Sequence, residues 1–483
     1  MVLSINELEK WIKQDLDQKR YFTKQSWCKP SRFDAGQKVY DVVIIGAGQC
    51  GLALAHNLKM RGIGRILVLD KQPLDKPGPW STFARMPALR TPKNIPAMES
   101  GNPLLSFRTW YCAQYSEAAY DSFDYIPTEN WKEYLAWFRK VLEIDVINEY
   151  EVAELESQTD ADCFKIIPRQ GDGQQVYFSK FVCLATGMTA SGAWHMPEEY
   201  VGLLPEHRIH CAWDDIDFRK FEGRRVAVIG SGAAAFDNAS ASIEHSCSQL
   251  TMFSRRIFPK GEGVSTILAR GRNDALIFDE ESGQAPADIL QPVLDYNQYL
   301  QPQDRAKLLA LFFKDGRSAP RPEYFANIKH IEKINILEGE KISDLRLNSR
   351  EEIELISNEK AHLFDELIIA TGPQYNLELR PELKHFHQDI LTWKDVIFDE
   401  NVLSLGVQPI LSESYQFRSK HGDSEEVISR LYSMSDVVLS TVGIQCVAKV
   451  SQIIAEDISK RLFHSSFDHI MDFIQDEENY QTN

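Results

Sequence analysis

Two glycine-rich segments carry the residue pattern best suited to chemistry in this chain of 483 residues. The first, Gly46-Ala47-Gly48-Gln49-Cys50-Gly51, follows the apolar run VYDVVIIG and begins a predicted helix over 49–61. Its three glycines let a strand turn sharply, let bare backbone approach a pyrophosphate, and let the helix pack closely on the sheet. Asp70 ends the next apolar stretch, where its carboxylate can hydrogen-bond a ribose diol. This segment therefore predicts a dinucleotide site.

The second segment reads Gly230-Ser231-Gly232-Ala233-Ala234-Ala235 and follows the apolar run RRVAVIG. Ala235 occupies the position of the third glycine, where alanine is a tolerated variant of the same pattern. The place that corresponds to Asp70 is Ser254, followed by Arg255 and Arg256. A ribose 2′-phosphate repels a carboxylate and prefers guanidinium groups. We therefore expect FAD at the first segment and NADPH at the second.

Both segments belong to the same larger plan of strands and helices. Each is followed by a helix and an apolar strand, and later by an apolar strand that ends in Ala-Thr-Gly, at 181–187 and at 366–372. The distance from Gly46 to Gly187 is 141 residues, and from Gly230 to Gly372 it is 142. Continuous apolar strands are typical of parallel sheets covered on both faces. The predicted fold is α/β, with two Rossmann-like dinucleotide-binding domains and the NADPH domain inserted in the FAD domain.

The expected boundaries follow from this repeat. They are an N-terminal helical arm over 1–38, the first part of the FAD domain over 39–220, the NADPH domain over 221–365 with a helical and loop insertion at 257–332, and the second part of the FAD domain with C-terminal helices over 366–483. Within the arm, helical spacing predicts a packing face made of Leu8, Trp11, Ile12 and Leu16.

Composition excludes several classes of function. The net charge of −17 argues against binding of nucleic acid or of an anionic membrane. The eight cysteines form no CxxC pair and no zinc-like cluster, so no metal site is predicted and scattered thiols indicate a reducing, cytoplasmic setting. The N-terminus lacks the apolar core of a secretory signal, and no apolar run approaches the roughly 18 residues of a membrane span. The twelve histidines show no HxxxH pair, and none is assigned a catalytic role.

The two motifs in this order, each with its Ala-Thr-Gly strand, resemble the flavoproteins with two dinucleotide-binding domains. Within these, the chain looks most like the class B flavin-dependent monooxygenases over roughly 39–260 and 364–450. The supporting features are GAGQCG, the Gly78-Pro79-Trp80 step, the Ser254-Arg255-Arg256 triplet and both Ala-Thr-Gly strands, although flavin-containing monooxygenases usually have a GGxW-like step in place of Gly78-Pro79-Trp80. The resemblance implies that NADPH reduces FAD, that reduced flavin and O2 form a C4a-(hydro)peroxyflavin, and that this species oxygenates a small nucleophilic substrate. N-hydroxylation of an amine is expected first and S-oxygenation second.

Two stretches bear on the subtype. The family fingerprint FxGxxxH is not matched, since Gly202 is followed by His207 and His210 at another spacing, which disfavours Baeyer–Villiger oxygenation of a ketone. The stretch LRTPKN at 89–94, followed by the aromatic segment SFRTWYCAQY, is similar to the N-hydroxylating amine monooxygenases. Lys93 is the expected catalytic contact to substrate, NADP⁺ or peroxide.

Alternatives remain open at this point. The chain could instead be an NADPH–FAD electron-transfer reductase with a protein partner, or a flavin-binding sensor without activity. A homo-oligomer is compatible with the sequence, and the expected partners are a small-molecule substrate and O2. The residues expected to hold the two cofactors are Gly46, Gly48, Gln49, Gly51, Asp70, Lys71, Trp80, Thr186, Gly187, Gly230, Ser231, Gly232, Ala233, Ser254, Arg255, Arg256, Thr371, Gly372 and, at the start of a C-terminal helix, Gln445.

Overall fold

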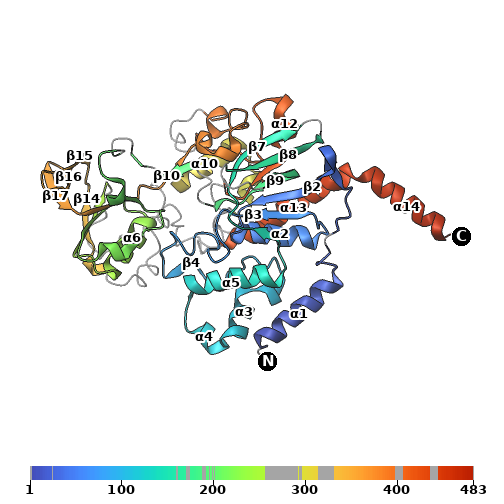
Figure 1. The fold of residues 1–483 in the computed structure, drawn as a ribbon, viewed down its shortest axis with the longest axis horizontal. Helices are drawn as coiled ribbons and strands as arrows, with labels where there is room; N and C mark the ends of the chain where they lie inside the picture. The colour runs from blue at the N-terminus through green and yellow to red at the C-terminus, as the bar shows by residue number, and fades with distance from the viewer. Residues whose placement is uncertain are drawn as a thin grey trace, which may run out of the picture.

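The computed structural model describes residues 3–23, 25–158, 161–169, 175–187, 192–194, 196–197, 200, 202–255, 292, 296–313, 331–397, 406–435 and 444–481. Two sheets lie in separate parts of the molecule (Figure 1). The larger sheet has eight strands and the smaller one has five. Within the described residues, no helix combines the length and apolar character that crossing a bilayer requires. This two-sheet α/β arrangement confirms the predicted fold class.

The larger sheet is built on a parallel centre. Its order is β6 (Val146–Ile147), β3 (Ile66–Leu69), β2 (Gln37–Ile45), β9 (Tyr177–Leu184), β8 (Cys163–Pro168) and β7 (Val152–Gln158), while β1 (Ser31–Phe33) pairs with β2 and β20 (Leu431–Ser433) pairs with β9. Strands β6, β3, β2, β9 and β20 run parallel, and β7 and β8 run antiparallel to their neighbours. The return of the chain at β20 completes this sheet, as the sequence predicts.

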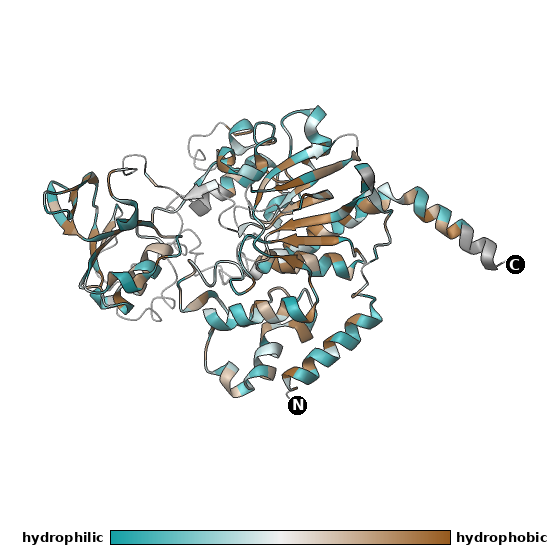
Figure 2. Cartoon of the chain, viewed as in Figure 1, coloured by the Kyte–Doolittle hydropathy of each residue, from teal (hydrophilic) through white to brown (hydrophobic). Residues whose placement is uncertain are grey.

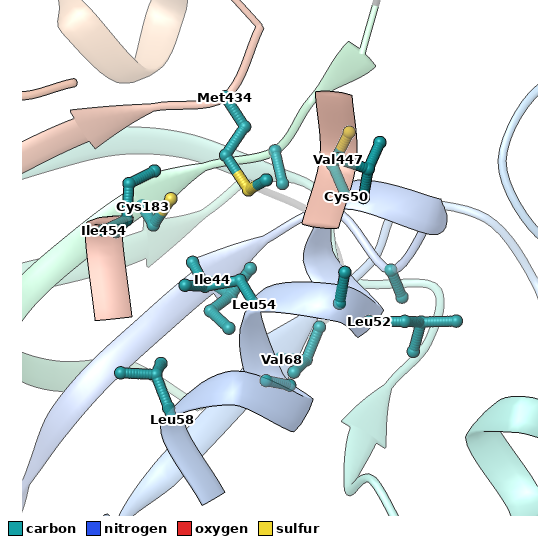
Figure 3. Close-up of a cluster of buried hydrophobic side chains, with 14 of the residues drawn as sticks. Ile44, Cys50, Leu52, Leu54, Leu58, Val68, Cys183, Met434, Val447 and Ile454 are labelled. Carbon is teal, nitrogen blue, oxygen red and sulfur yellow. The ribbon is translucent and has the colours of Figure 1, made fainter. Parts of the chain in front are cut away.

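Two helices far apart in sequence cover one face of that sheet. Helix α2 (Gln49–Met60) buries nearly all of its side chains, because α13 (Ile444–Ser465) packs on its other side. Figure 3 shows Ile44 and Val68 of the strands meeting Leu54 and Leu58 of α2 and Ile454 of α13. The parallel strands at the centre of this sheet are mostly hydrophobic (Figure 2), which is what strands with both faces covered require.

The N-terminal arm is helix α1 (Ile5–Gln18), which begins with a capping box between Ser4 and Glu7. Leu8, Ile12 and Leu16 are fully buried, as predicted. Trp11 is 57% exposed, so its predicted place on the packing face is wrong. The helix packs on α3 (Phe107–Gln114) and α5 (Thr128–Val141), whose aromatic rings form a shared cluster that includes buried Trp110. With α4 (Glu117–Asp121), these helices form a layer beside the larger sheet (Figure 1).

The smaller sheet is entirely parallel, in the order β11 (Ile209–Cys211), β18 (Glu366–Ile369), β12 (Arg225–Ile229), β13 (Gln249–Ser254) and β14 (Asn335–Glu338). Helix α6 (Ala233–Glu244) covers one face, and the antiparallel strands β15 (Ile342–Leu347), β16 (Ile353–Ser357) and β17 (Lys360–Phe364) contribute the core of the other. Strands β11 and β18 lie outside the predicted span of 221–365. That boundary is corrected here, because the strand that ends in Ala-Thr-Gly pairs with β12 of its own repeat rather than with the first domain.

A short ribbon carries the chain between the two sheets. Strands β10 (Gly192–Trp194) and β19 (Pro373–Tyr375) pair antiparallel, with Gly192 opposite Tyr375. β10 follows the last parallel strand of the first repeat, and β19 follows that of the second. Both passages between the domains therefore run through one hydrogen-bonded unit.

The remaining elements connect or extend this framework. Most of the predicted insertion at 257–332 lies outside the described residues. Its helix α10 (Pro302–Phe313) places the Arg305 guanidinium 5.6 Å from the ring centre of Trp393, in the segment that returns to the larger sheet. Strands β4 (Ala88–Pro92) and β5 (Tyr125–Pro127) form a pair, and α12 (Gly422–Ile428) precedes β20. Helix α14 (Phe467–Gln481) extends away from the body (Figure 1).

The core of the first domain contains a histidine whose ionisation opposes folding. His56 of α2 is 2% exposed, and its Nδ1 lies 3.0 Å from the Tyr21 hydroxyl. Burial, aided by nearby lysines, lowers the pKa of His56 to about 3 from an ordinary value of 6.5. Between these two values the unfolded chain binds a proton that the folded chain does not. Stability therefore falls as the pH is lowered through this window.

We predict that His56→Gln flattens this pH dependence. The slope of unfolding free energy against pH, measured by urea titration between pH 7 and 5, should fall by up to about 1.4 kcal/mol per pH unit, because one titrating group is removed. His469→Gln, at an exposed site of α14, is the matched control. Equal slopes for wild type and His56→Gln would contradict a neutral buried imidazole.

Candidate functional site

A cavity of about 1400 Å³ lies where the carboxyl ends of the two parallel sheets face each other. Both glycine loops line it, and so do both Ala-Thr-Gly strand ends. Ligands of open parallel sheets bind at the carboxyl ends of the strands. The predicted site residues that the structure brings together on this wall are Gly46, Gly48, Gln49, Asp70, Lys71, Trp80, Thr186, Gly187, Gly230, Ser231, Gly232, Ala233, Arg255, Thr371 and Gly372.

The glycines of the first loop have two different roles. Gly46 has φ +111°, and a Cβ there would lie 2.3 Å from the carbonyl oxygen of Ala185. Gly51 is equally closed, since its Cβ would meet the carbonyl of Gly46, and it does not line the cavity. A Cβ on Gly48, the N-cap of α2, would have only Gly78 Cα nearby, at 3.9 Å. Gly46 and Gly51 therefore serve packing, whereas Gly48 keeps the approach to the helix N-terminus open.

Asp70 fixes the shape of that loop. Its Oδ2 accepts a hydrogen bond from the backbone N–H of Ala47 at 2.5 Å, and its Oδ1 accepts one from Gln72 at 2.7 Å. Burial raises the pKa of Asp70, and these two hydrogen bonds oppose that rise. Each carboxylate oxygen keeps a further lone pair that can accept a ribose hydroxyl. The carboxylate can therefore brace the loop and bind a ligand at once.

The second loop repeats this geometry. Gly230 has φ +136°, and its Cβ would lie 2.3 Å from the carbonyl oxygen of Ala370. Gly232 is the N-cap of α6, and a Cβ there would meet nothing within 4 Å. Two helix N-termini with unobstructed approaches thus face one cavity, and each offers backbone N–H groups and a positive dipole end to an anion.

The end of β13 is only partly as predicted. Ser254 is fully buried and does not line the cavity, whereas Arg255 is exposed and does; Arg256 lies outside the described residues. Lys341 adds a second cation to this wall. The sequence analysis missed it because it belongs to the turn between β14 and β15, far along the chain. Glu340 beside it accepts a hydrogen bond from the Ser357 hydroxyl at 2.5 Å.

Trp80 contributes an unsatisfied donor beside the cavity. The residue lines the cavity, and among the described residues its buried Nε1 has no hydrogen-bond partner. A buried N–H of this kind is ordinarily satisfied. Together with the open glycines and Asp70, it gives the first loop a donor and acceptor set that fits a flavin dinucleotide.

Lys93 is not brought together with the other predicted site residues. Its ammonium donates to the carbonyl oxygen of Tyr120 at 2.8 Å and lies 4.5 and 5.1 Å from the ring centres of Tyr120 and Phe123. It is not part of the cavity wall. Local sequence does not reveal this placement, because the aromatic partners come from a separate helix and turn. Gln445 lies in the first turn of α13, as predicted.

Two arginines that the sequence analysis missed link the first domain to the second, and one of them, Arg90, also lines the cavity. Arg85 donates to the carbonyl oxygens of Ala212, at 2.5 Å, and Asp214. Burial lowers the pKa of Arg85 to about 10, which still leaves it charged at neutral pH. Arg90 of β4 pairs with Asp237 of α6 at 2.5 Å. The one feature of the sequence that could have indicated this ion pair is Asp237, a carboxylate among the small and apolar residues at the start of α6.

Among the described residues, ligand atoms of Glu154, Glu156 and His385 lie within 4.8 Å of one another. This group is at the surface and outside the cavity wall, and Lys384 pairs with Glu154. Exposed groups of this kind are common without an ion, so it carries no metal assignment.

The two classes of glycine can be separated by stability. Gly46→Ala should lower the unfolding free energy by at least about 2 kcal/mol, because it adds both a backbone clash and a strained positive φ. Gly48→Ala should change it by less than about 1 kcal/mol, since the added methyl group enters open space. Urea unfolding of both variants checks this. Similar losses would show that the loop is packed differently from the structure described.

Comparison with known proteins follows the same division of the chain. Residues 43–264 match the family model described as pyridine nucleotide-disulphide oxidoreductase. The FAD-dependent urate hydroxylase of Xanthomonas campestris pv. campestris is 29% identical over 92% of this chain and 89% of its own length.

Solved structures share the fold at lower identity. The ornithine hydroxylase of Pseudomonas aeruginosa, in its reduced form, has a TM-score of 0.62 and 16% identity, covering 88% of this chain and all of its own. The cadaverine monooxygenase of Erwinia amylovora has a TM-score of 0.60 and 16% identity, covering 87% and 95%. These findings confirm the predicted resemblance. The chain is an oxidoreductase that is similar in sequence to FAD-dependent urate hydroxylase and shares the fold of solved N-hydroxylating flavin monooxygenases.

Proposed function

We propose that this chain is a flavoprotein monooxygenase that binds FAD and NADPH and transfers one oxygen atom of O2 to a small nucleophilic substrate. The observation that carries the proposal is the single cavity faced by both glycine loops. Two dinucleotides anchored at facing helix N-termini can bring their reactive rings together without a relay through the protein.

FAD is assigned to the first loop. Gly48 leaves room for its pyrophosphate, Asp70 can accept a ribose hydroxyl, and Trp80 offers a buried N–H. When bound and reduced, the flavin supplies the redox and oxygen chemistry. The chain then has to hold the ring, exclude water and orient the substrate. Leu89, Met434 and Tyr200 contribute an apolar wall suited to excluding water.

NADPH is assigned to the second loop. Gly232 leaves the start of α6 open for the pyrophosphate, and Arg255 and Lys341 lie on the wall at the end of β13. These cations support recognition of a ribose 2′-phosphate. The buried place of Ser254 is also consistent with this assignment, because no carboxylate stands at that position to repel the phosphate.

The substrate class is a nucleophile, and two kinds are supported. The amine hydroxylases share the fold, which favours oxygenation of nitrogen. The urate hydroxylase shares sequence over most of the chain, which favours an electron-rich carbon of a purine. The preference for amines relied on Lys93, and its contacts with Tyr120 give no support to that role. We therefore propose urate-like purines as the first substrates to test, with amines and thioethers next.

A disulfide reductase is disfavoured by the thiols. The chain has no CxxC pair, and the one cysteine on the described cavity wall is Cys50. Burial raises the pKa of Cys50 to about 12, so its thiol stays protonated at neutral pH. Thiol–disulfide exchange needs the thiolate.

The decisive experiment follows oxygen. Purified yellow protein is given NADPH under ¹⁸O2 with urate, a panel of diamines, thioethers and ketones. We expect one substrate class to accelerate NADPH oxidation and to gain one ¹⁸O atom per turnover. NADPH oxidation that proceeds only with artificial or protein electron acceptors, without labelled product, would favour the reductase alternative.

The two open glycines predict separable losses. Gly48→Val should give folded but colourless protein, because its methyl groups enter the FAD pyrophosphate path. Gly232→Val should stay yellow and bind NADPH at least about tenfold more weakly, or about 1.4 kcal/mol. Each variant is the control for the other. Absorbance of bound flavin and NADP⁺ titration measure the two effects, and loss of flavin in Gly232→Val would reverse the assignment.

Arg255 predicts cofactor preference. Arg255→Ala should weaken NADPH by about 1–3 kcal/mol and leave NADH nearly unchanged, since only NADPH carries the 2′-phosphate. The KM for each cofactor is the readout. Arg350→Ala, exposed in the same domain but off the cavity wall, is the control. An unaltered preference in Arg255→Ala would remove this residue from the phosphate site.

A further inference from the structure

The carboxylate of Asp237 is bound on one side only. This residue of α6 is 6% exposed and lines the cavity. Its Oδ2 pairs with Arg90 Nη2 at 2.5 Å. Its Oδ1 is buried and has no hydrogen-bond partner in the described part of the chain. Burial raises the pKa of Asp237, while Arg90 and Arg85 favour its charged form. A buried carboxylate oxygen without a donor is costly unless a ligand supplies one.

The position of Asp237 on α6 indicates which half of the dinucleotide proposed at the second glycine loop it could contact. Asp237 lies five residues after Gly232, and helical side chains lean toward the N-terminus, where the phosphates bind. The neighbouring Asn238 donates to the carbonyl oxygen of Ala212 at 3.2 Å, which places this face of α6 at the end of β11. Arg255 lies at the end of β13 on the other side of β12. The two residues therefore mark opposite directions along the edge of the sheet.

A dinucleotide that crosses this edge has its adenosine half over β13 and its nicotinamide half over β18 and β11. The nicotinamide half must also reach the first domain, where the proposed flavin lies. Arg90, on β4 of the first domain, meets Asp237 at this junction. The donors of that half are the carboxamide N–H groups and the ribose hydroxyls, whereas its phosphate would be repelled by the carboxylate.

We propose that Asp237 Oδ1 accepts a hydrogen bond from the nicotinamide half of NADPH, and that Arg90 positions the carboxylate for this contact. The proposal rests on the NADPH site of the proposed function. It makes the ion pair between the domains part of cofactor recognition. Arg90 keeps Oδ2 occupied, so Oδ1 is the carboxylate oxygen left to accept a donor.

Three probes test the contact by equilibrium titration of the flavoprotein. They are NADP⁺, its 3-acetylpyridine analogue, in which a methyl group replaces the amide nitrogen, and 2′,5′-ADP, which lacks the nicotinamide half. Asp237→Asn, which keeps the size of the side chain, should weaken NADP⁺ about tenfold and leave 2′,5′-ADP unchanged. Asp237→Glu is the second variant should the first fail to fold, with the same expected pattern.

The analogue identifies the donor. If the carboxamide donates, the analogue should bind wild type about tenfold more weakly than NADP⁺ and lose nothing further in Asp237→Asn. If a ribose hydroxyl donates, the analogue and NADP⁺ should lose affinity equally in the variant. Both results support the proposal, and they distinguish the carboxamide from the ribose hydroxyl as the donor.

Arg90→Gln tests whether the ion pair with Asp237 contributes to NADP⁺ recognition or has only a structural role. It breaks the same pair but keeps the Asp237 oxygens, so NADP⁺ should weaken less than in Asp237→Asn. Unchanged NADP⁺ affinity in Asp237→Asn, or equal losses for NADP⁺ and 2′,5′-ADP in either variant, would overturn the proposal. Failure of wild type to bind either NADP⁺ or 2′,5′-ADP would instead overturn the NADPH site itself.

Discussion

The close approach of each glycine loop to its neighbouring strand end is the constraint on which the cavity depends. Gly46 lies against the carbonyl of Ala185, and Gly230 lies against the carbonyl of Ala370, at distances that admit no side chain. Each contact fixes where the following helix begins. The helix N-termini then point at the space between the sheets, and Asp70 holds the first loop in that shape through the N–H of Ala47. A shift of either loop would turn a binding surface away from the cavity.

The two domains contribute unequally to the wall. The first offers a carboxylate, a buried indole N–H and an apolar surface, which suit a ring system that must be kept from water. The second offers exposed cations near the end of β13 and a half-paired carboxylate near the start of α6. Arg85 and Arg90 cross from the first domain to the second, so the cofactor cavity and the contact between the domains share residues.

Sequence predicted the parts of this site that local pattern determines. Both glycine loops, Asp70 and the strand ends were found because a turn that admits phosphate requires those residues at fixed spacing. Lys93 was misjudged in position because Tyr120 and Phe123, which it contacts, are remote in sequence. Arg90 and Asp237 are 147 residues apart, so neither signals the other. The boundary error at β18 arose from treating the last strand of the second repeat as a return to the first domain, whereas β18 pairs with β12. Strand β11 was assigned to the first domain because it precedes the second glycine segment, whereas it pairs with β18.

The ribbon formed by β10 and β19 has a consequence for how such a chain can arise. Gly192 and Tyr375 are register partners, so the chain leaves the first domain and re-enters it at adjacent points. A domain whose entry and exit are neighbours can be inserted into a host fold without pulling the host apart. The antiparallel pair of β10 and β19 is the point at which the second domain is inserted. The second domain is therefore an insertion in the chain of the first, and its entry and exit run through this two-stranded ribbon.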